Sequence, residues 1–356
     1  DITAVKTQSE GNNLEHDTDN GEHNSLVQVD SDTYALAYAG TDDDGFISTF
    51  TISNDGETIT KVATLEFAPN NGQYNSLVQV DSDTYALAFA AAENVGRITT
   101  FTISADGSSI TKVKSLIHAP NNGEHNSLVQ VDSDTYALAY EGNNNDGWIS
   151  TFTIPADGSS ITKVDTLEHD TERGTHNSLV QVDSDTYALA YRGDNFDGFI
   201  STFTIDSDGN ITAVKTQSEG NNLEHDTNAS FHNSLVQVDS DTYALAYRGT
   251  DNDGFISTFT IDSDGNITAV KTQSEGNNLE HDTNASFHNS LVQVDSDTYA
   301  LAYRGADDDG FISTFTISPD DTTSSTPSTS TESNKSSGAC GFDRDCTPPR
   351  ITNHGT

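Results

Sequence analysis

Val29–Ala37 reads VDSDTYALA, and this nine-residue stretch decides the fold because the chain contains it six times. An asparagine five residues before each copy marks the period, at Asn24, Asn75, Asn126, Asn177, Asn233 and Asn289. Successive markers are 51, 51, 51, 56 and 56 residues apart. A regular period of this order is typical of repeat architectures, in which each unit packs mainly against its neighbours.

Each repeat predicts four short strands that are rich in Val, Ile, Thr, Tyr and Phe. The first three are seen at Ser25–Val29, Thr33–Tyr38 and Phe46–Ile52, and the fourth at Ile211–Thr216 of a later repeat. Asp-Ser-Asp and Asp-Gly sequences between the strands favour tight turns. No segment has an apolar period of 3.6 residues, so we expect almost no helix.

The two ends of the repeat array complement each other. The sixth repeat stops after its third strand, Phe311–Ile317, whereas the chain opens with a fourth strand, Ile2–Thr7, that has no unit before it. The sequence that follows this strand, SEGNNLEHDT, occurs at Ser9–Thr18, Ser218–Thr227 and Ser274–Thr283. A strand from the opposite end of the chain would complete the last sheet and remove its open edge. We therefore predict an all-β, six-bladed β-propeller over residues 1–319, closed by the N-terminal strand.

Alternation within the second strand agrees with this architecture. Tyr34, Leu36 and Tyr38 share one face, and Ala35 and Ala37 share the other. A propeller blade is covered on both faces by its neighbours, so a bulky face can pack against a small one.

The C-terminal residues leave the repeat pattern. Residues 320–338 are rich in Ser, Thr and Pro, which predicts a disordered linker or an O-glycosylated stalk. Residues 339–356 hold the only two cysteines, Cys340 and Cys346. A small disulfide loop between them favours an oxidising compartment. The final residues look like the start of a further region.

The composition is strongly acidic, with 56 Asp and Glu against 15 Lys and Arg and a formal charge of −41. This field repels nucleic acid and anionic membranes, so we expect no nucleic-acid partner. No stretch approaches the roughly 20 apolar residues of a membrane span. The chain has no methionine, even at position 1, which suggests a processed or trimmed protein.

Ten of the eleven histidines fall at two repeat positions. The first position, directly before the repeat asparagine, holds His23, Tyr74, His125, His176, His232 and His288. The second, in the connection between repeats, holds His16, Phe67, His118, His169, His225 and His281. The first set is expected at a channel mouth, where imidazoles would bind a ligand or metal or respond to protons. The alternative is a packing role in the turns, which Tyr74 and Phe67 favour.

Acidic loops ending in glycine, such as TDDDGF from Thr41, connect the second and third strands. Loops rich in carboxylates bind calcium in other proteins, so calcium is the one cofactor that we consider. The candidate ligands are Asp42, Asp44, Asp194, Asp197, Asp251, Asp253, Asp307 and Asp309. The spacing differs from that of an EF-hand, so an acidic hairpin turn is the alternative. The Asp-Ser-Asp turns on the opposite face leave the same two alternatives open.

Five Asn-x-Ser/Thr sequences are candidate glycosylation sites, at Asn210, Asn228, Asn266, Asn284 and Asn334. Four of them lie in predicted loops or turns of the propeller. Their placement favours glycans on at least some of these asparagines.

Enzyme motifs are not found, and near-identical blades present the same groups about six times. This repetition favours multivalent binding or assembly. We therefore expect a non-catalytic extracellular or cell-envelope protein that acts in surface structure, adhesion or filament or lattice assembly, with copies of itself or other surface proteins as partners. The alternative is a multivalent glycan-binding lectin with sites between blades. Its candidate aromatic residues are Phe46, Trp148, Phe199, Phe255 and Phe311.

The run HNSLVQVDSDTYALAY…DGFISTFTI resembles propeller-like repeats in secreted and cell-surface proteins of marine archaea. The tail CGFDRDCTPP is similar to a segment that recurs in large archaeal surface proteins ahead of further domains. The resemblance implies an extracellular or cell-surface location, and it carries no functional residue over to this chain.

Overall fold

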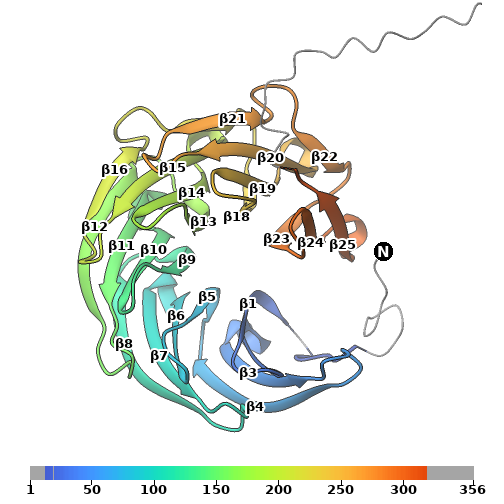
Figure 1. Ribbon diagram of the computed structural model, residues 1–356. Coiled ribbons are helices and arrows are strands. Elements are labelled where there is room, and N and C mark those ends of the chain that lie inside the picture. The colour runs from blue at the N-terminus through green and yellow to red at the C-terminus, as the bar shows by residue number, and fades with distance from the viewer. Residues whose placement is uncertain (1–12, 19, 319–356) are drawn as a thin grey trace, which may run out of the picture. The chain divides into compact units, whose positions relative to one another are not determined.

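The computed structural model describes residues 13–18 and 20–318. The chain divides into a unit of Asp1–Thr322 and a unit of Thr323–Thr356, and the second lies wholly outside the described residues, as do Cys340, Cys346 and Asn334. Six separate antiparallel sheets are arranged around a common central axis, which is also the axis of the predicted channel (Figure 1). They are called blades one to six in chain order. The prediction of an all-β, six-bladed propeller is confirmed.

In each blade the strands follow one another from the channel outward. Blade one holds β1 (Glu22–Gln28), β2 (Thr33–Ala39), β3 (Gly45–Ile52) and β4 (Ile59–Ala68). Blade two holds β5 (Gln73–Gln79), β6 (Thr84–Ala90), β7 (Gly96–Ile103) and β8 (Ile110–Ala119). Blade three holds β9 (Glu124–Gln130), β10 (Thr135–Glu141), β11 (Gly147–Thr153) and β12 (Thr162–Asp170).

The later blades have more strands or fewer. Blade four holds β13 (Thr175–Gln181), β14 (Thr186–Arg192), β15 (Gly198–Ile205), β16 (Ile211–Lys215) and β17 (Leu223–Asp226). Blade five holds β18 (Phe231–Gln237), β19 (Thr242–Arg248), β20 (Gly254–Ile261), β21 (Ile267–Lys271) and β22 (Leu279–Asp282). Blade six holds β23 (Phe287–Gln293), β24 (Thr298–Arg304) and β25 (Gly310–Thr316).

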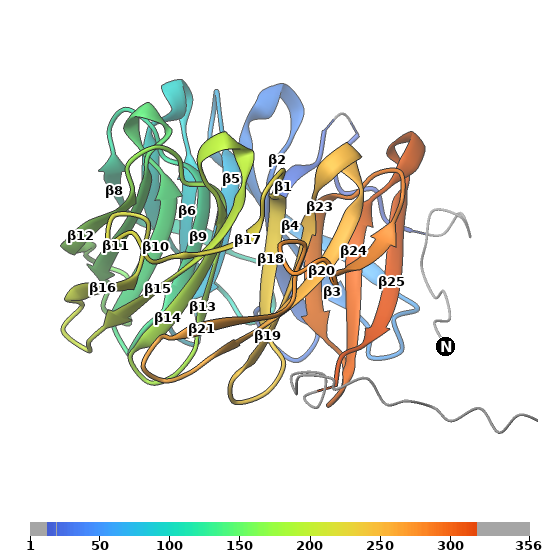
Figure 2. The same ribbon diagram turned by 90° about the horizontal axis from the view of Figure 1, so that it is seen from above.

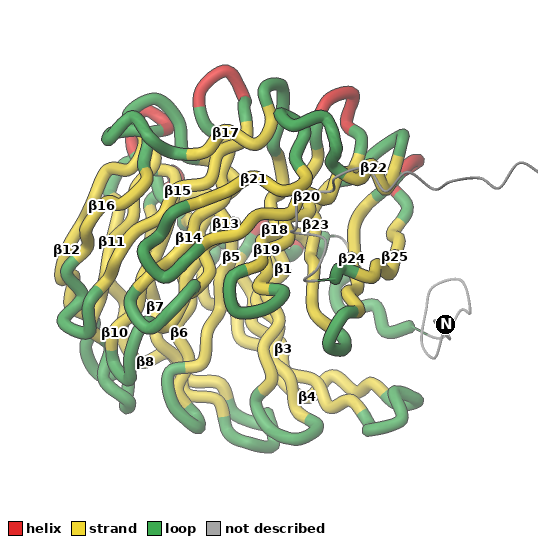
Figure 3. Tube along the Cα trace, turned by 45° about the horizontal axis from the view of Figure 1, so that its top comes forward, coloured by secondary structure: helices red, strands yellow, loops and turns green. Residues whose placement is uncertain are grey.

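Helix is confined to short 3-10 turns in the described residues, as the sequence pattern predicts. One turn precedes the third strand of each blade, at Thr41–Asp43, Ala92–Asn94, Asn143–Asn145, Asp194–Phe196, Thr250–Asn252 and Ala306–Asp308. These turns gather on one face of the ring (Figures 2 and 3). In the part of the chain that the structure describes, no helix has the length and apolar character needed to cross a membrane.

The fourth strand explains why the period changes along the chain. In blade one it is the single strand β4, whereas in blade four it is split into β16 and β17 by a turn. The turn is closed by the Thr216 amide, which donates to Asn221 Oδ1 at 2.9 Å. The turn adds six residues, because Ile211–Asp226 is 16 residues long and the equivalent Ile161–Asp170 is 10 residues long. The hairpin before it is one residue shorter, so the period grows by five, from 51 to 56.

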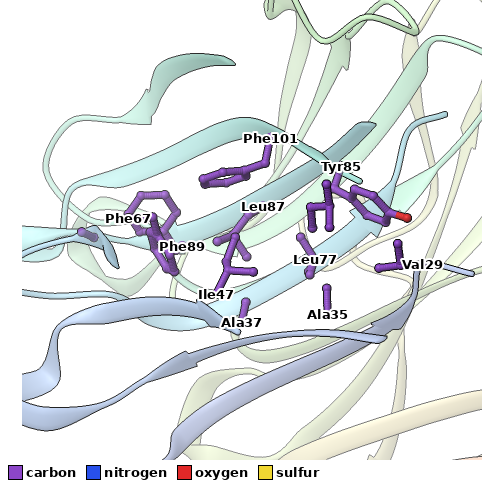
Figure 4. Packing of buried hydrophobic residues seen from close by; sticks show 12 residues of the cluster. Val29, Ala35, Ala37, Ile47, Phe67, Leu77, Tyr85, Leu87, Phe89 and Phe101 are labelled. Atoms are coloured by element: carbon purple, nitrogen blue, oxygen red, sulfur yellow. The ribbon is translucent and has the colours of Figure 1, made fainter. Parts of the chain in front are cut away.

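Adjacent blades pack a small face against a bulky one, as the alternation predicts. Ala35 and Ala37 of blade one lie in a buried cluster with Tyr85, Leu87 and Phe101 of blade two (Figure 4). Comparable clusters join each later pair of consecutive blades. Burial of each large side chain contributes about 1.5–3 kcal/mol to the free energy of unfolding, so these interfaces dominate the stability of the ring.

The junction between blade six and blade one differs from the other five (Figure 1). Ile312 is 62% exposed, although its counterpart Ile47 is fully buried, and Leu26 is 58% exposed, although its counterpart Leu77 is 4% exposed. No fourth strand lies beside β25 among the described residues. The predicted closing strand, Ile2–Thr7, lies outside those residues, so closure by this strand stays a prediction.

Enlarging one alanine of the small face tests the interface packing. Ala139 is fully buried between blades three and four, so Ala139→Leu should lower the free energy of unfolding by about 1–3 kcal/mol through overpacking. Urea unfolding followed by circular dichroism measures the change. The matched control is Ala302→Leu, because Ala302 is the exposed counterpart in blade six. An equal loss in both variants would contradict an open junction between blades six and one.

Candidate functional site

One ring of side chains surrounds the mouth of the central channel. It comprises His23, Tyr74, His125, His176, His232 and His288, which line a cavity of about 1050 Å³. Within this mouth ring, the centroids of consecutive side-chain rings lie 4.1–4.7 Å apart. The structure therefore brings the five histidines of the predicted ligand site together, and Tyr74 stands between two of them.

A backbone irregularity places the mouth ring. Each member has a left-handed backbone with φ between 51° and 54°, next to a β-bulge such as the one between Glu22 and Ser25. Non-glycine residues in this conformation are strained and cluster at functional sites. The repeat asparagine that follows a ring member links it to the preceding blade. Asn177 Nδ2 donates to the carbonyl oxygen of His125 at 3.1 Å, and Asn233 Nδ2 donates to the carbonyl oxygen of His176 at 3.0 Å.

Burial keeps the mouth-ring imidazoles neutral. It lowers the pKa of His23 to about 4, of His125 to about 3 and of His232 to about 2. A neutral imidazole can accept a proton or coordinate an electrophile. The ring therefore does not act as a proton switch at neutral pH, and a member becomes an effective base only where a neighbouring group stabilises its imidazolium form.

The second histidine set packs between blades. His118 and His169 are buried and meet Tyr140 and Tyr191 edge-on, with ring centroids 4.7 Å apart in both pairs. Both partners are replaced at the junction of blades one and two, where Phe67 of β4 meets Phe89 of β6 with ring centroids 4.8 Å apart. The paired replacement supports the packing alternative for this set.

The acidic loops form the 3-10 turns at the same end of the blades. The Asp43 carbonyl accepts from the Gly72 amide at 2.9 Å, so the first loop is tied to the connection that enters blade two. The calcium candidates Asp42, Asp44, Asp194, Asp197, Asp251, Asp253, Asp307 and Asp309 lie in these turns or directly after them. Among residues 13–18 and 20–318, no three or more His, Cys, Asp or Glu side chains are grouped to hold a metal. Calcium binding stays a prediction.

The predicted glycosylation sites of the propeller lie on its surface. Asn210, Asn228, Asn266 and Asn284 are exposed. Asn210 Nδ2 donates to Asp206 Oδ2 at 2.8 Å, and Asn266 makes the equivalent contact with Asp262. Glycan occupancy stays a prediction.

The blades differ from one another at the rim of the channel mouth. The residue before each mouth-ring member pairs in register with the last residue of the blade's second strand. These rim pairs are Glu22–Ala39, Gln73–Ala90, Glu124–Glu141, Thr175–Arg192, Phe231–Arg248 and Phe287–Arg304. Blade three thus carries two acids, and blades four to six carry arginines. Reasoning from the repeats missed this set, although comparing the six copies at these two positions would have found it.

Glu141 lies directly behind the mouth ring in blade three. Its side chain is 7% exposed, and its Oε2 atom lies 3.6 Å from Nε2 of His125. Burial and the neighbouring Glu124 raise the pKa of Glu141 to about 7, although Arg192 opposes the rise. Because His125 is neutral at this pH, the contact is not an ion pair. The separation is longer than a hydrogen bond, so Glu141 is a close carboxyl neighbour of His125 and not a bonded partner.

Arginine and phenylalanine side chains alternate along the neighbouring part of the rim. The Arg192 guanidinium lies 4.4 Å from the centre of the Phe231 ring, and that of Arg248 lies 4.0 Å from the same ring and 4.4 Å from Phe287. Nε of both arginines is buried and lacks a hydrogen-bond partner among the described residues. Burial lowers the pKa of Arg192 to about 10, so it stays charged at neutral pH. Such groups are suited to carboxylates and oxyanions.

The buried carboxyl should make stability depend on pH. The pKa of Glu141 is about 7 in the folded chain and about 4.3 in an unfolded chain. Between these values this carboxyl binds more protons in the folded state, so its contribution to the free energy of unfolding falls as pH rises. Glu141→Ala, which introduces the residue of Ala39 and Ala90, should remove this fall. Urea unfolding between about pH 4 and 8 gives the free energy of unfolding of the parent and of Glu141→Ala at each pH. If the difference between the two free energies does not change with pH, the raised pKa of a buried Glu141 is contradicted.

The comparisons with known proteins point to lactonases. The family model described as lactonase, 7-bladed beta-propeller, matches residues 34–181. A putative 6-phosphogluconolactonase of Bacteroides fragilis is similar, with 14% identity, a TM-score of 0.56, and coverage of 82% of this chain and 83% of that one. The periplasmic gluconolactonase of Pseudomonas aeruginosa is similar too, with 16% identity, a TM-score of 0.54, and coverage of 81% and 82%. No curated protein matches the chain.

These matches correct the expected function. The prediction of a non-catalytic surface, adhesion or assembly protein, with a lectin as its alternative, is wrong, because the matched family and three of the similar structures are named as lactonases. The symmetry argument behind that prediction fails at the rim, where the six pairs differ in charge. The structural likeness itself, at these identities, establishes the propeller fold. The resemblance to archaeal surface proteins and the extracellular location stay predictions.

Proposed function

We propose that the protein hydrolyses lactones, the cyclic esters of polyhydroxy acids, at the mouth ring. The contact between His125 and Glu141 carries the proposal, because it supplies an oriented base inside a cavity. The residues matched by the lactonase family model include both side chains and Glu124. The cavity volume slightly exceeds the range of about 300–1,000 Å³ that is usual for ligand sites. It includes space beside Val292, Ala302 and Ile312 at the junction of blades six and one.

The neutral His125 imidazole is the proposed general base, and stabilisation of its imidazolium by Glu141 has to offset the low pKa that burial gives it. It accepts a proton from a water molecule as the water oxygen attacks the lactone carbonyl carbon. Glu141 is a positioning residue, since its contact with Nε2 orients the ring and its carboxylate stabilises the imidazolium that forms. Catalytic contacts of this kind are often long before the substrate binds, and a separation of 3.6 Å fits that pattern.

The rim arginines are proposed to hold the negative charge that develops. Arg192 stands in the blade after His125 and is close enough to lower the pKa of that histidine. Its guanidinium would stabilise the tetrahedral oxyanion. The ring C–O bond then breaks, the imidazolium returns its proton to the alkoxide, and a hydroxy acid forms. Arg192 and Arg248 would bind the carboxylate of this product.

Substitutions taken from other blades test the base and its orienting acid. His125→Tyr introduces the residue of blade two, and Glu141→Ala that of blades one and two, so both variants should fold. Each should lower kcat/KM for glucono-1,5-lactone by roughly 10²–10⁴-fold, because base catalysis is lost. A pH-stat measures acid release.

His288→Tyr is the matched control for the histidine substitution. His288 belongs to the mouth ring, but the rim pair of its own blade, Phe287–Arg304, contains no acid. This variant should lose less than about fivefold in kcat/KM, far below the loss expected for removing a general base. Equal losses at His125 and His288 would contradict the assignment of His125.

The pH dependence of the rate should follow Glu141. Below a pH of about 7 its carboxyl is protonated and no longer stabilises the His125 imidazolium. We expect kcat/KM to fall by about tenfold for each pH unit below that value and to level off above it. Glu141→Ala should give a low rate without this inflection. A parent profile that is flat between about pH 5 and 8 would be incompatible with the proposal.

A further inference from the structure

A second cavity, of about 320 Å³, lies where the end of β4 in blade one meets blade two, and we call it the blade-two cavity. Its lining includes Phe67, Ala68, Phe89, Ala91, Arg97 and Lys112. None of these residues lines the cavity at the mouth ring. The volume is within the usual range for a small ligand, about 300–1,000 Å³.

Blade three shows what normally fills this space. The connection Ala-Pro-Asn-Asn enters both blades, at residues 68–71 and 119–122. Asn71 Nδ2 donates to the Ala91 carbonyl and Asn122 Nδ2 to the Gly142 carbonyl, both at 3.2 Å, so the two frameworks correspond. Blade three places Trp148, packed against its core cluster, where blade two has Arg97. The cavity therefore stands where an indole ring lies in the next blade.

A paired change of sequence leaves this space open. The other five blades have a glycine before the 3-10 turn and an aromatic residue at the position of Arg97. A Cβ on Gly142 would overlap the ring of Trp148, and a Cβ on Gly193 would overlap that of Phe199. Ala91 carries such a Cβ, so an aromatic side chain at position 97 would clash with it. Ala91 and Arg97 together keep the space free.

Two cations border the cavity without a partner. Neither Arg97 nor Lys112 has a hydrogen bond or ion pair with any residue that the structure describes. The counterparts Lys61 and Lys163 donate instead to backbone carbonyls, of His16 at 2.9 Å and of His118 at 3.5 Å. Partial desolvation and repulsion by the nearby Arg97 lower the pKa of Lys112, which is otherwise an exposed residue. An anion between them would relieve this repulsion.

We propose that this cavity binds a small aromatic carboxylate. Its ring would occupy the place that the Trp148 indole takes in blade three, against Phe67 and Phe89, which lie side by side (Figure 4). Its carboxylate would bind between Arg97 and Lys112, whose donors match carboxylate oxygens. The site is separate from the mouth ring, and the proposal does not rest on lactone hydrolysis.

Two ligands that share one ring test the proposal by calorimetry. Indole-3-acetate carries the carboxylate, and indole-3-ethanol is its neutral counterpart. The parent protein should bind indole-3-acetate at least roughly tenfold more tightly, and Arg97→Gln with Lys112→Gln should remove that preference. Equal affinity for the two ligands in the parent protein would overturn the proposal.

A second variant fills the cavity with the side chains of blade three. Ala91→Gly with Arg97→Trp copies Gly142 and Trp148, a pair of residues that already pack together in blade three. It should weaken indole-3-acetate binding by at least roughly tenfold and leave lactone hydrolysis unchanged. Unchanged binding would place the ligand elsewhere, such as at the rim arginines, and would contradict the proposal.

Discussion

The packing of a small blade face on a bulky one is the interaction on which the rest of the structure depends. Alanines such as Ala35 and Ala37 let the next sheet approach closely enough to bury its tyrosine, leucine and phenylalanine side chains. A larger residue on the small face would separate the sheets, and a smaller one on the bulky face would leave a void. The same solution is repeated at five consecutive junctions, which is why the strand sequences vary so little.

This constraint is weaker at the ends of the strands, and the blades differ there. The rim pairs of the mouth ring range from Glu124–Glu141 to Phe287–Arg304 without disturbing the interfaces between blades. The same freedom opens the blade-two cavity, where Ala91 and Arg97 replace a glycine and an aromatic residue. Repetition supplies the framework, and a few end-of-strand substitutions supply asymmetric chemistry.

Much of the fold follows from the sequence alone, but less of the site does. The period, the strand alternation and the scarcity of helix predict the propeller, because packing selects those features in every copy. The channel-mouth position of His125 follows from the same argument. The role of Glu141 does not, because its raised pKa depends on burial and on Glu124 across the sheet. The rim pairs were also missed because the repeats are nearly identical, and a comparison of whole repeats gives little attention to two variable positions.

The most direct test of the account is whether the purified chain opens a lactone ring at all. Acid release from glucono-1,5-lactone at pH 7, followed in a pH-stat against buffer and against heat-unfolded protein, measures this. The account predicts a saturable rate above the spontaneous one that disappears on unfolding. A rate equal to that of buffer would contradict a hydrolytic site at the mouth ring.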